Sequence, residues 1–322
     1  MAMQIAPGIL NDMSSSGPNG LTPILWYPGL IEKDNDVNTF EEICETTGEL
    51  QEGGDTMIMS NIPNVPIQRD FGPGDELVTT ALDSPKVTLY LNRSAAFSPI
   101  IDDIQEAQMK KNANWRNALM AQAAIDVKND QDKVILQSVG ADADVNNTVV
   151  GATNAGAKSH RYNIGGTANI GAAGGPLQLV AASMIQWLTN LSSVLGEANV
   201  PIGQRWAIVP EWVMNLIMNS DIKSASMMGE KDGSILKGNG RVPYPICNLN
   251  LYVNEHLATT TISGTTCTEV LFGGKGCIMY ASQLKKLENS RPSKTFETIL
   301  KGLVTYGFKT YKPNRLGVSV VY

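Results

Sequence analysis

Histidine and cysteine, the residue types that most often build catalytic and metal sites, are few in this sequence and lie far apart. The 322 residues include two histidines, His160 and His256, and neither has a Cys, His or carboxylate partner at a ligand spacing such as H-E-x-x-H. We interpret both as surface or turn residues. The four cysteines are Cys44, Cys247, Cys267 and Cys277. Their spacing favours free thiols in a reducing compartment over a zinc site or a disulfide framework.

Carboxylates and glycines offer no better basis for catalysis. Asp102 and Asp103 are adjacent, but neighbours on a helix point in different directions and do not form an acid–base pair. No G-x-S-x-G elbow occurs, so Ser-His-Asp hydrolysis has no local support. The glycine pairs at 165–166 and 174–175 lack the G-K-[ST] that completes a phosphate-binding loop. We therefore predict no catalytic, cofactor-binding or metal-binding residues and expect that the protein is not an enzyme.

The composition is that of a weakly acidic, water-soluble chain. The formal net charge is −6, with 43% hydrophobic and 17% charged residues. The low charged fraction fits either neutral polar surfaces, as at subunit contacts, or ordinary compositional scatter. Net acidity argues against a dedicated nucleic-acid binder but leaves room for a local basic face. No apolar run reaches the ~18 residues of a membrane span, and the first residues lack the pattern of a secretory signal.

The longest regular stretch of the sequence predicts a helix over Ser98–Val139. Ser98 is a good N-cap, and Pro99 suits the first helical position, where its missing N–H costs nothing. No further Pro or Gly occurs before Gly140, which is a natural stop. Such a helix would be on the order of 60 Å long, with one modest apolar stripe and a polar back. We expect a strut that packs one side on a sheet.

A hairpin with a long connection precedes this helix. Residues 56–60 and 86–92 alternate as strands, and the segment 61–85 between them, called the excursion below, is stiffened by prolines. A connection of this length is usually functional or disordered. The charged residues near its tip are Arg69, Asp70, Asp75 and Glu76. They would form ion pairs across a subunit interface or belong to a solvated loop, where each pair contributes little.

The first 47 residues are irregular but keep many apolar side chains, Trp26 among them. They would wrap around the chain's own core or form an arm that reaches a neighbouring subunit.

The remainder mixes helices and strands without regular βαβ alternation, which predicts an α+β fold. We expect helices over 176–196 and from Pro210, a glycine-rich mobile loop over 224–245, and a short helix or turn over 282–290. The expected strands are 206–209, 248–254, 269–272, 276–281, 298–311 and 316–322.

This order of elements resembles the major capsid protein of tailed bacteriophages, which has the Hong Kong 97 type fold. ALDSPKVTLYLN, at 81–92, resembles the returning strand of that family's E-loop hairpin, and 98–139 resembles the spine helix of its P-domain. RWAIVPEWVMNLI, at 205–217, resembles the strand and helix of its axial A-domain, and NLNLYVNEHL, at 248–257, resembles the next strand. Residues 270–291 and 303–322 resemble the family's final stretch.

The resemblance implies an α+β phage capsid fold in five parts. The parts are an N-terminal arm at 1–47, the E-loop hairpin at 48–93, the P-domain with spine helix 98–139 and connecting loops at 94–175, the A-domain at 176–272, and a return to P-domain strands at 273–322.

The function implied is that of a structural head protein that self-assembles into hexamers and pentamers of an icosahedral shell enclosing double-stranded DNA. It would belong to the virion and be assembled in the host cytoplasm. The expected partners are a separate scaffolding protein, a portal and a cement protein, without a fused scaffolding domain, membrane or cofactor. Expected inter-subunit contacts are Arg69, Asp70, Asp75, Glu76 and Trp26, and the residues facing DNA, through weak non-specific contact, are Lys110, Lys111 and Arg116.

Two alternatives remain open at this point. An encapsulin-like nanocompartment shell shares the spine and A-domain but usually carries an N-terminal helix in place of an irregular arm. An enzyme with a pocket in the α+β half, around His160 and the glycines, is the other class. The excursion contains no lysine, so cross-linking through an E-loop lysine is not expected.

Overall fold

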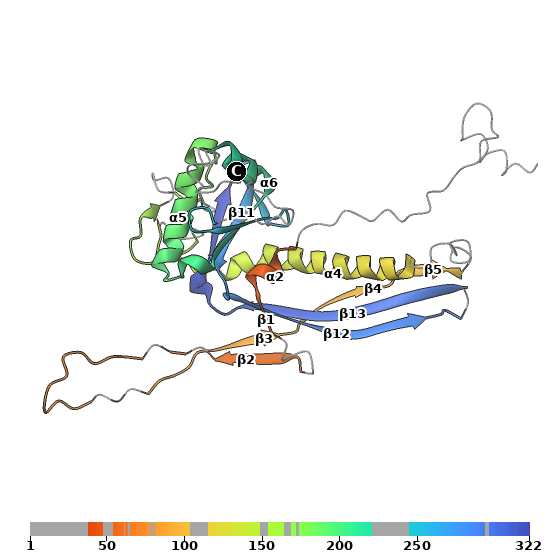
Figure 1. The fold of residues 1–322 in the computed structure, drawn as a ribbon, viewed down its shortest axis with the longest axis horizontal. Helices are drawn as coiled ribbons and strands as arrows, with labels where there is room; N and C mark the ends of the chain where they lie inside the picture. The colour runs from red at the N-terminus through yellow and green to blue at the C-terminus, as the bar shows by residue number, and fades with distance from the viewer. Residues whose placement is uncertain are drawn as a thin grey trace, which may run out of the picture.

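Two sheets of different shape organise the molecule. The computed structural model describes residues 38–47, 54–60, 62–63, 65–77, 79, 81–103, 115–148, 154–163, 169–171, 174–220, 245–293 and 296–322. A compact end contains helices α5 (Met184–Glu197) and α6 (Glu211–Asn219) and strand β11 (Thr265–Gly274). From it, helix α4 (Trp115–Val139) and strands β12 (Ile278–Ser290) and β13 (Glu297–Thr310) extend together (Figure 1). Helices combine with mostly antiparallel sheets and show no regular βαβ alternation, so the predicted α+β class is confirmed.

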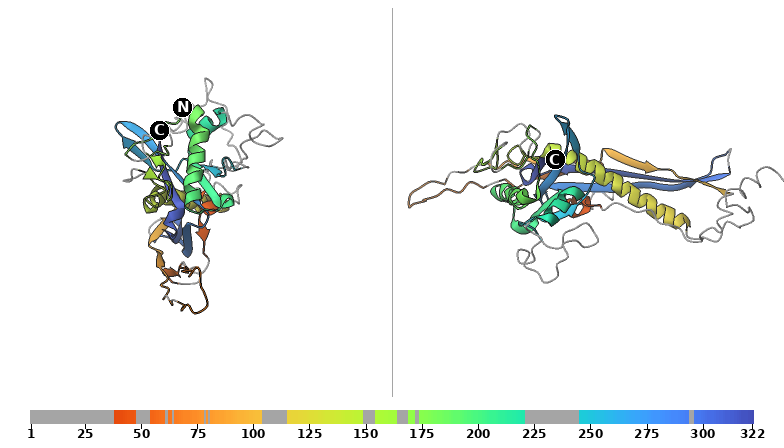
Figure 2. Two further views of the ribbon diagram at one scale, coloured as in Figure 1. Left: turned by 90° about the vertical axis from the view of Figure 1, so that its left-hand side faces the viewer. Right: turned by 90° about the horizontal axis from the view of Figure 1, so that it is seen from above.

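The long sheet is built on the antiparallel pair β12–β13, which runs in register from Ile278↔Thr310 to Ser290↔Ile299. Strands β4 (Arg93–Phe97) and β5 (Ile100–Asp102) pair with successive parts of β13, and β1 (Glu45–Thr46) pairs with β12 in parallel. Helix α4 runs alongside this sheet (Figure 2). Its 25 residues correspond to ~38 Å, so the predicted strut on a sheet is present.

The predicted start of that helix at Ser98 is wrong. The segment after Pro99 is strand β5, not the first turns of a helix. Proline has no N–H to donate and separates two short strands here, and the two isoleucines that follow suit a strand pairing with the edge of β13. Helix α4 is described from Trp115 onward, and residues 104–114 lie outside the described residues.

The short helix or turn expected over 282–290 is also wrong, because these residues form the second half of β12. The spacing of Leu284 and Leu287 fits one helical turn, yet β13 offers hydrogen-bonding partners along the whole length. A register shift between Leu284 and Lys286 marks the one irregularity of this pairing. Pairing with a distant strand therefore overrides the local pattern.

The second sheet lies in the compact end and has the strand order β10–β11–β8–β9, with β14 also paired to β11. Besides β11, this sheet contains β8 (Arg205–Val209), β9 (Asn250–Val253), β10 (Thr259–Ile262) and β14 (Leu316–Val321). Because β14 joins this sheet, residues 273–322 are divided between the two sheets instead of returning wholly to the long one.

Both faces of the second sheet are covered, and strand β8 shows this most clearly. All five of its residues are buried. Ala207 and Val209 pack in a core with α5 and α6, whereas Trp206 and Ile208 pack in a second core that includes Leu136 of α4. A strand buried on both faces is a continuous apolar run without alternation, which explains the sequence WAIV after Arg205. The Arg205 guanidinium is buried too and donates hydrogen bonds to the carbonyl oxygens of Val200 and Ser192.

A buried carboxylate joins the two halves of the molecule. Asp132 of α4 is fully buried, and its Oδ1 accepts hydrogen bonds from the backbone N–H groups of Thr39, at 3.1 Å, and Phe40, at 2.9 Å. Its Oδ2 accepts a bond from Asn254 Nδ2 at 2.7 Å and lies 3.0 Å from His256 Nδ1. One side chain thereby fixes the spine helix, the start of helix α2 (Phe40–Ile43) and the turn after β9.

The interpretation of His256 as a surface or turn residue misses its carboxylate partner, although the residue does lie in the turn after β9. Its side chain is 15% exposed and faces Asp132, which lies 124 residues away in the sequence. A search at ligand spacings does not find such a pair, because only the packing of α4 against the second sheet brings the two together.

We predict that Asp132→Ala lowers the free energy of unfolding by about 3 kcal/mol, because it leaves buried N–H donors without an acceptor. Denaturant unfolding measures this. The matched control is Asp130→Ala on the exposed side of the same helix, expected within about 0.5 kcal/mol of the wild type. Equal effects of the two substitutions would contradict the assignment.

Candidate functional site

The described part of the chain offers little support for metal chemistry or membrane insertion. No group of three or more His, Cys, Asp or Glu side chains among these residues is placed to hold a metal ion. None of the described helices is both long and apolar enough to span a bilayer. The features that stand out are a projecting excursion and a groove at its root.

The root of the excursion is anchored tightly. Strands β2 (Thr56–Ser60) and β3 (Lys86–Tyr90) pair over five residues, and Leu89 of β3 is fully buried against β12. Strand β13 passes so close that a Cβ on Gly307 would lie 2.0 Å from the carbonyl oxygen of Tyr90. Any side chain at that position would force the two strands apart, so the hairpin and the long sheet form one body.

Beyond this root the excursion leaves the rest of the molecule. It extends from the compact end in the direction opposite to the long sheet (Figures 1 and 2). Six large apolar side chains on it are between 51% and 89% exposed. They are Ile62, Val65, Ile67, Phe71, Leu77 and Leu82. A monomeric protein rarely exposes so many apolar groups on one segment, so this surface marks an interaction site.

The four charged residues predicted for subunit contacts share the far end of this loop and are all exposed. Asp75 Oδ2 accepts a hydrogen bond from the backbone N–H of Gly72 at 2.7 Å and so stabilises the turn at the tip. Arg69, Asp70 and Glu76 form no ion pair with another described residue. Their side chains are thus available to a partner.

The other predicted contact residues cannot be placed. Trp26, Lys110 and Lys111 lie outside the described residues. Arg116 belongs to the first turn of α4, but its side chain also lies outside what is described. The loop expected over 224–245 falls almost entirely within residues 221–244, outside the described part.

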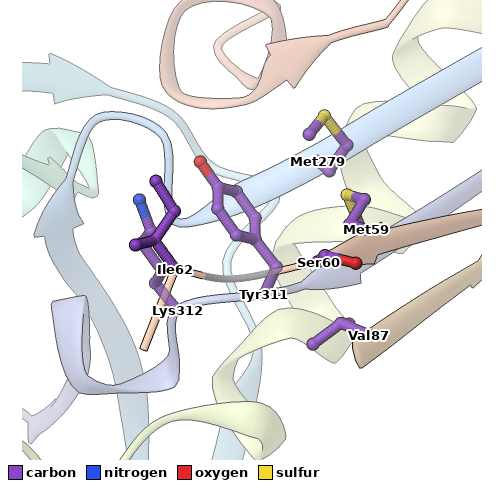
Figure 3. A pocket seen from close by; sticks show the side chains of 7 residues that line it. All are labelled: Met59, Ser60, Ile62, Val87, Met279, Tyr311 and Lys312. Atoms are coloured by element: carbon purple, nitrogen blue, oxygen red, sulfur yellow. The ribbon is translucent and has the colours of Figure 1, made fainter. Parts of the chain in front are cut away.

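A groove of two adjoining cavities lies at the root of the excursion. The first, about 290 Å³, is mostly apolar and is lined by Met59, Ser60, Ile62, Val87, Met279, Tyr311 and Lys312 (Figure 3). The second, about 330 Å³, is lined by Glu45, Gln204, Lys275, Gly276, Tyr311, Lys312 and Arg315. Tyr311 and Lys312 line both, so one groove has an apolar end and a basic end.

Three basic side chains and one carboxylate set the charge of the basic end. The Tyr311 hydroxyl donates a hydrogen bond to Glu45 Oε2 at 2.9 Å. Burial and this neighbouring carboxylate raise the pKa of Tyr311 to about 12, so the hydroxyl remains a donor at neutral pH. Lys312 Nζ lies 4.9 Å from the Tyr311 ring centroid in a cation–π contact. Lys275, Lys312 and Arg315 have no ion-pair partner among the described residues.

A separate cavity, distinct from the groove, lies between helix α4 and the long sheet. It measures about 540 Å³, and its walls come from α4, β12, β13 and the residues around α2. Leu284 and Leu287 at its rim are more than half exposed. The sequence did not indicate either hollow, because the residues that line each one come from segments far apart in the chain.

Comparison with known proteins was made on sequence and on structure. No protein-family model matches the sequence, and no curated protein matches it either. A structure from Mycobacterium phage Che8 is similar with a TM-score of 0.65 at 19% identity, covering 94% of this chain and 98% of the other. The capsid structure of the cyanophage P-SCSP1u gives a TM-score of 0.67 at 13% identity and covers 99% of both chains.

The capsid of Ralstonia phage GP4 is similar with a TM-score of 0.61 at 12% identity, over 100% of this chain and 97% of the other. These similarities span the whole chain at low sequence identity, so they define its fold. The chain has the fold of phage capsid structures, and the resemblance to the Hong Kong 97 type is confirmed at that level.

We predict that Tyr311→Phe lowers the free energy of unfolding by about 1 kcal/mol, since it removes the hydrogen bond that joins the end of β13 to Glu45. Chemical denaturation of the purified protein measures the effect. Tyr90→Phe, at a tyrosine that is 57% exposed, is the control and should change stability by less than about 0.5 kcal/mol. A larger loss for the control than for Tyr311 would refute this role of the hydroxyl.

Proposed function

We propose that this protein is the major head protein of a tailed phage, a structural subunit that forms hexamers and pentamers of an icosahedral shell around double-stranded DNA. The observation that carries the proposal is the excursion, with six exposed apolar side chains that no other described part of the chain covers. The capsid fold over the whole length of the chain supports the same reading.

The energetic argument favours assembly over a free monomer. Fully burying one aliphatic or aromatic side chain is worth roughly 1.5–3 kcal/mol. Six such groups on a segment anchored at one end only can gain this free energy from neighbouring subunits. A contact in which one copy's projection meets a different surface on the next copy closes into a ring when the rotation is right.

The same proposal covers the partners and the location. A separate scaffolding protein would guide assembly in the host cytoplasm, a portal would occupy one vertex, and a cement protein would add strength in the finished virion. Arg69, Asp70, Asp75, Glu76 and Trp26 would contact other subunits. Lys110, Lys111 and Arg116 would touch packaged DNA through weak, non-specific charge interactions. A structural role of this kind needs no catalysis.

Electron microscopy of the purified protein, alone and from infected cells, tests the proposal. We expect uniform icosahedral shells and, from infected cells, tailed particles filled with DNA. Shells that contain cargo enzymes and no genome would favour an encapsulin-like compartment. A compact monomer that never oligomerises would refute a shell protein of either kind.

We predict that deleting residues 61–79 leaves a folded, soluble protein that forms no stable shells. The root strands and both sheets keep their contacts, while the contact surface on the excursion is lost. Circular dichroism reports the fold, and electron microscopy with sedimentation reports the shells. Normal particles from the deletion would defeat the idea.

A variant of unchanged length separates lost apolar contacts from altered loop length. Ile62, Ile67 and Leu77 changed together to Ser should reduce shell yield by about tenfold or more, because each loses an apolar contact. The control changes Val145, Val180 and Ile202 to Ser, three side chains elsewhere on the chain that are 50–58% exposed. We expect this control to retain shells.

A further inference from the structure

The basic end of the groove has an excess of positive charge that the described residues do not neutralise. Lys275, Lys312 and Arg315 surround it, and Glu45 is the one carboxylate in its lining. That carboxylate already accepts the Tyr311 hydroxyl. Cations gathered without partners around a small hollow attract an anionic group, and complementary charge both selects and orients such a partner.

The tip of the excursion has the complementary composition. Asp70, Asp75 and Glu76 outnumber the single Arg69, and the exposed apolar side chains of Phe71 and Leu77 lie beside these acids in the chain. The groove likewise places an apolar cavity next to a basic one. Tip and groove therefore match in polarity as well as in charge.

The tip cannot occupy the groove of its own chain. The groove lies at the root of the excursion, formed in part by Met59 of β2 and Val87 of β3, while the excursion runs outward from that root (Figure 1). Its proline-containing limbs lead away from the groove (Figure 1). The matching segment must therefore come from a second copy.

We propose that the tip of one subunit, residues 67–77, seats in the groove at the root of the next subunit's excursion. Asp70 and Glu76 face Lys275, Lys312 and Arg315, and Phe71 lies on the apolar end beside Met59 and Met279. Asp75 stays in its own turn with Gly72. This inference deepens the proposed shell function and rests on it.

A carboxylate-bearing segment fits the groove better than a nucleic-acid backbone does. The apolar end of the groove is walled largely by methionine, valine and isoleucine side chains, which suit an apolar side chain of a partner and not a phosphodiester backbone. Each copy would offer a tip and receive one, so the contact is heterologous and builds a closed ring of subunits.

A charge-reversal cycle tests the contact. One variant carries Lys275→Glu with Lys312→Glu, a second carries Asp70→Lys with Glu76→Lys, and a third combines all four changes. Each pair alone should lower shell yield by about tenfold or more, and the combination should restore it to within about threefold of the wild type. Asp75 is left unchanged because it holds the turn.

The control pair is Lys133→Glu with Lys301→Glu, two exposed lysines away from the groove, and it should assemble normally. Thermal unfolding of each unassembled variant separates a folding defect from an assembly defect. Carbodiimide treatment of shells mixed from ¹⁴N- and ¹⁵N-labelled protein should link Asp70 or Glu76 of one copy to Lys275 or Lys312 of another.

Each result supports or overturns the inference. Rescue by the combined variant, together with the intermolecular links, supports it. Groove-reversed variants that assemble as well as the wild type overturn it. Groove-reversed variants that form normal shells but retain less DNA also overturn the inference, because the groove would then bind the phosphates of DNA. A wild-type chain that forms no shells overturns the proposed function itself, and this outcome is distinct because it appears before any substitution.

Discussion

The exposed apolar surface of the excursion is the physical constraint that explains the rest of this structure. The side chains of Ile62, Ile67 and Leu77 are exposed on a segment that meets the rest of the described chain at its root. A loop of this kind is retained only where something else buries it. The remaining architecture gives the excursion a firmly anchored base.

The rigid base comes from close packing and a few buried polar contacts. Gly307 lets β13 approach the end of β3, and Leu89 is fully buried against β12, so the hairpin moves with the long sheet. In the C-terminal half of α4, Asp132 joins the spine helix to residues 39–40 and to the turn after β9. A projection can place its tip accurately on a neighbour only if its base does not flex, and these contacts provide that stiffness.

Sequence patterns located most of the elements. The alternation at 56–60 and 86–92, the double-sided apolar run of β8 and Pro210 before α6 identify elements whose local chemistry and tertiary role agree. Prediction from sequence patterns failed where the local chemistry and the tertiary role of a segment disagree. Residues 100–102 and 282–290 have helical spacing or capping signals, but both lie beside β13, whose open backbone groups they pair with. Local spacing carries no information about which distant strand is available.

The sequence alone determined most of the element order, the proline-stiffened excursion and the acids at its tip, because each follows from residues close together in the chain. The capsid-like fold followed from the resemblance to a known family. Only the tertiary structure decided which distant groups meet. Asp132 finds His256 across 124 positions. Likewise, Lys275 and Arg315 line one cavity with Glu45 because strand β1, the turn between β11 and β12 and the connection between β13 and β14 converge there. Such sites depend on the relative placement of whole elements, which backbone pairing and burial set and which no local spacing records.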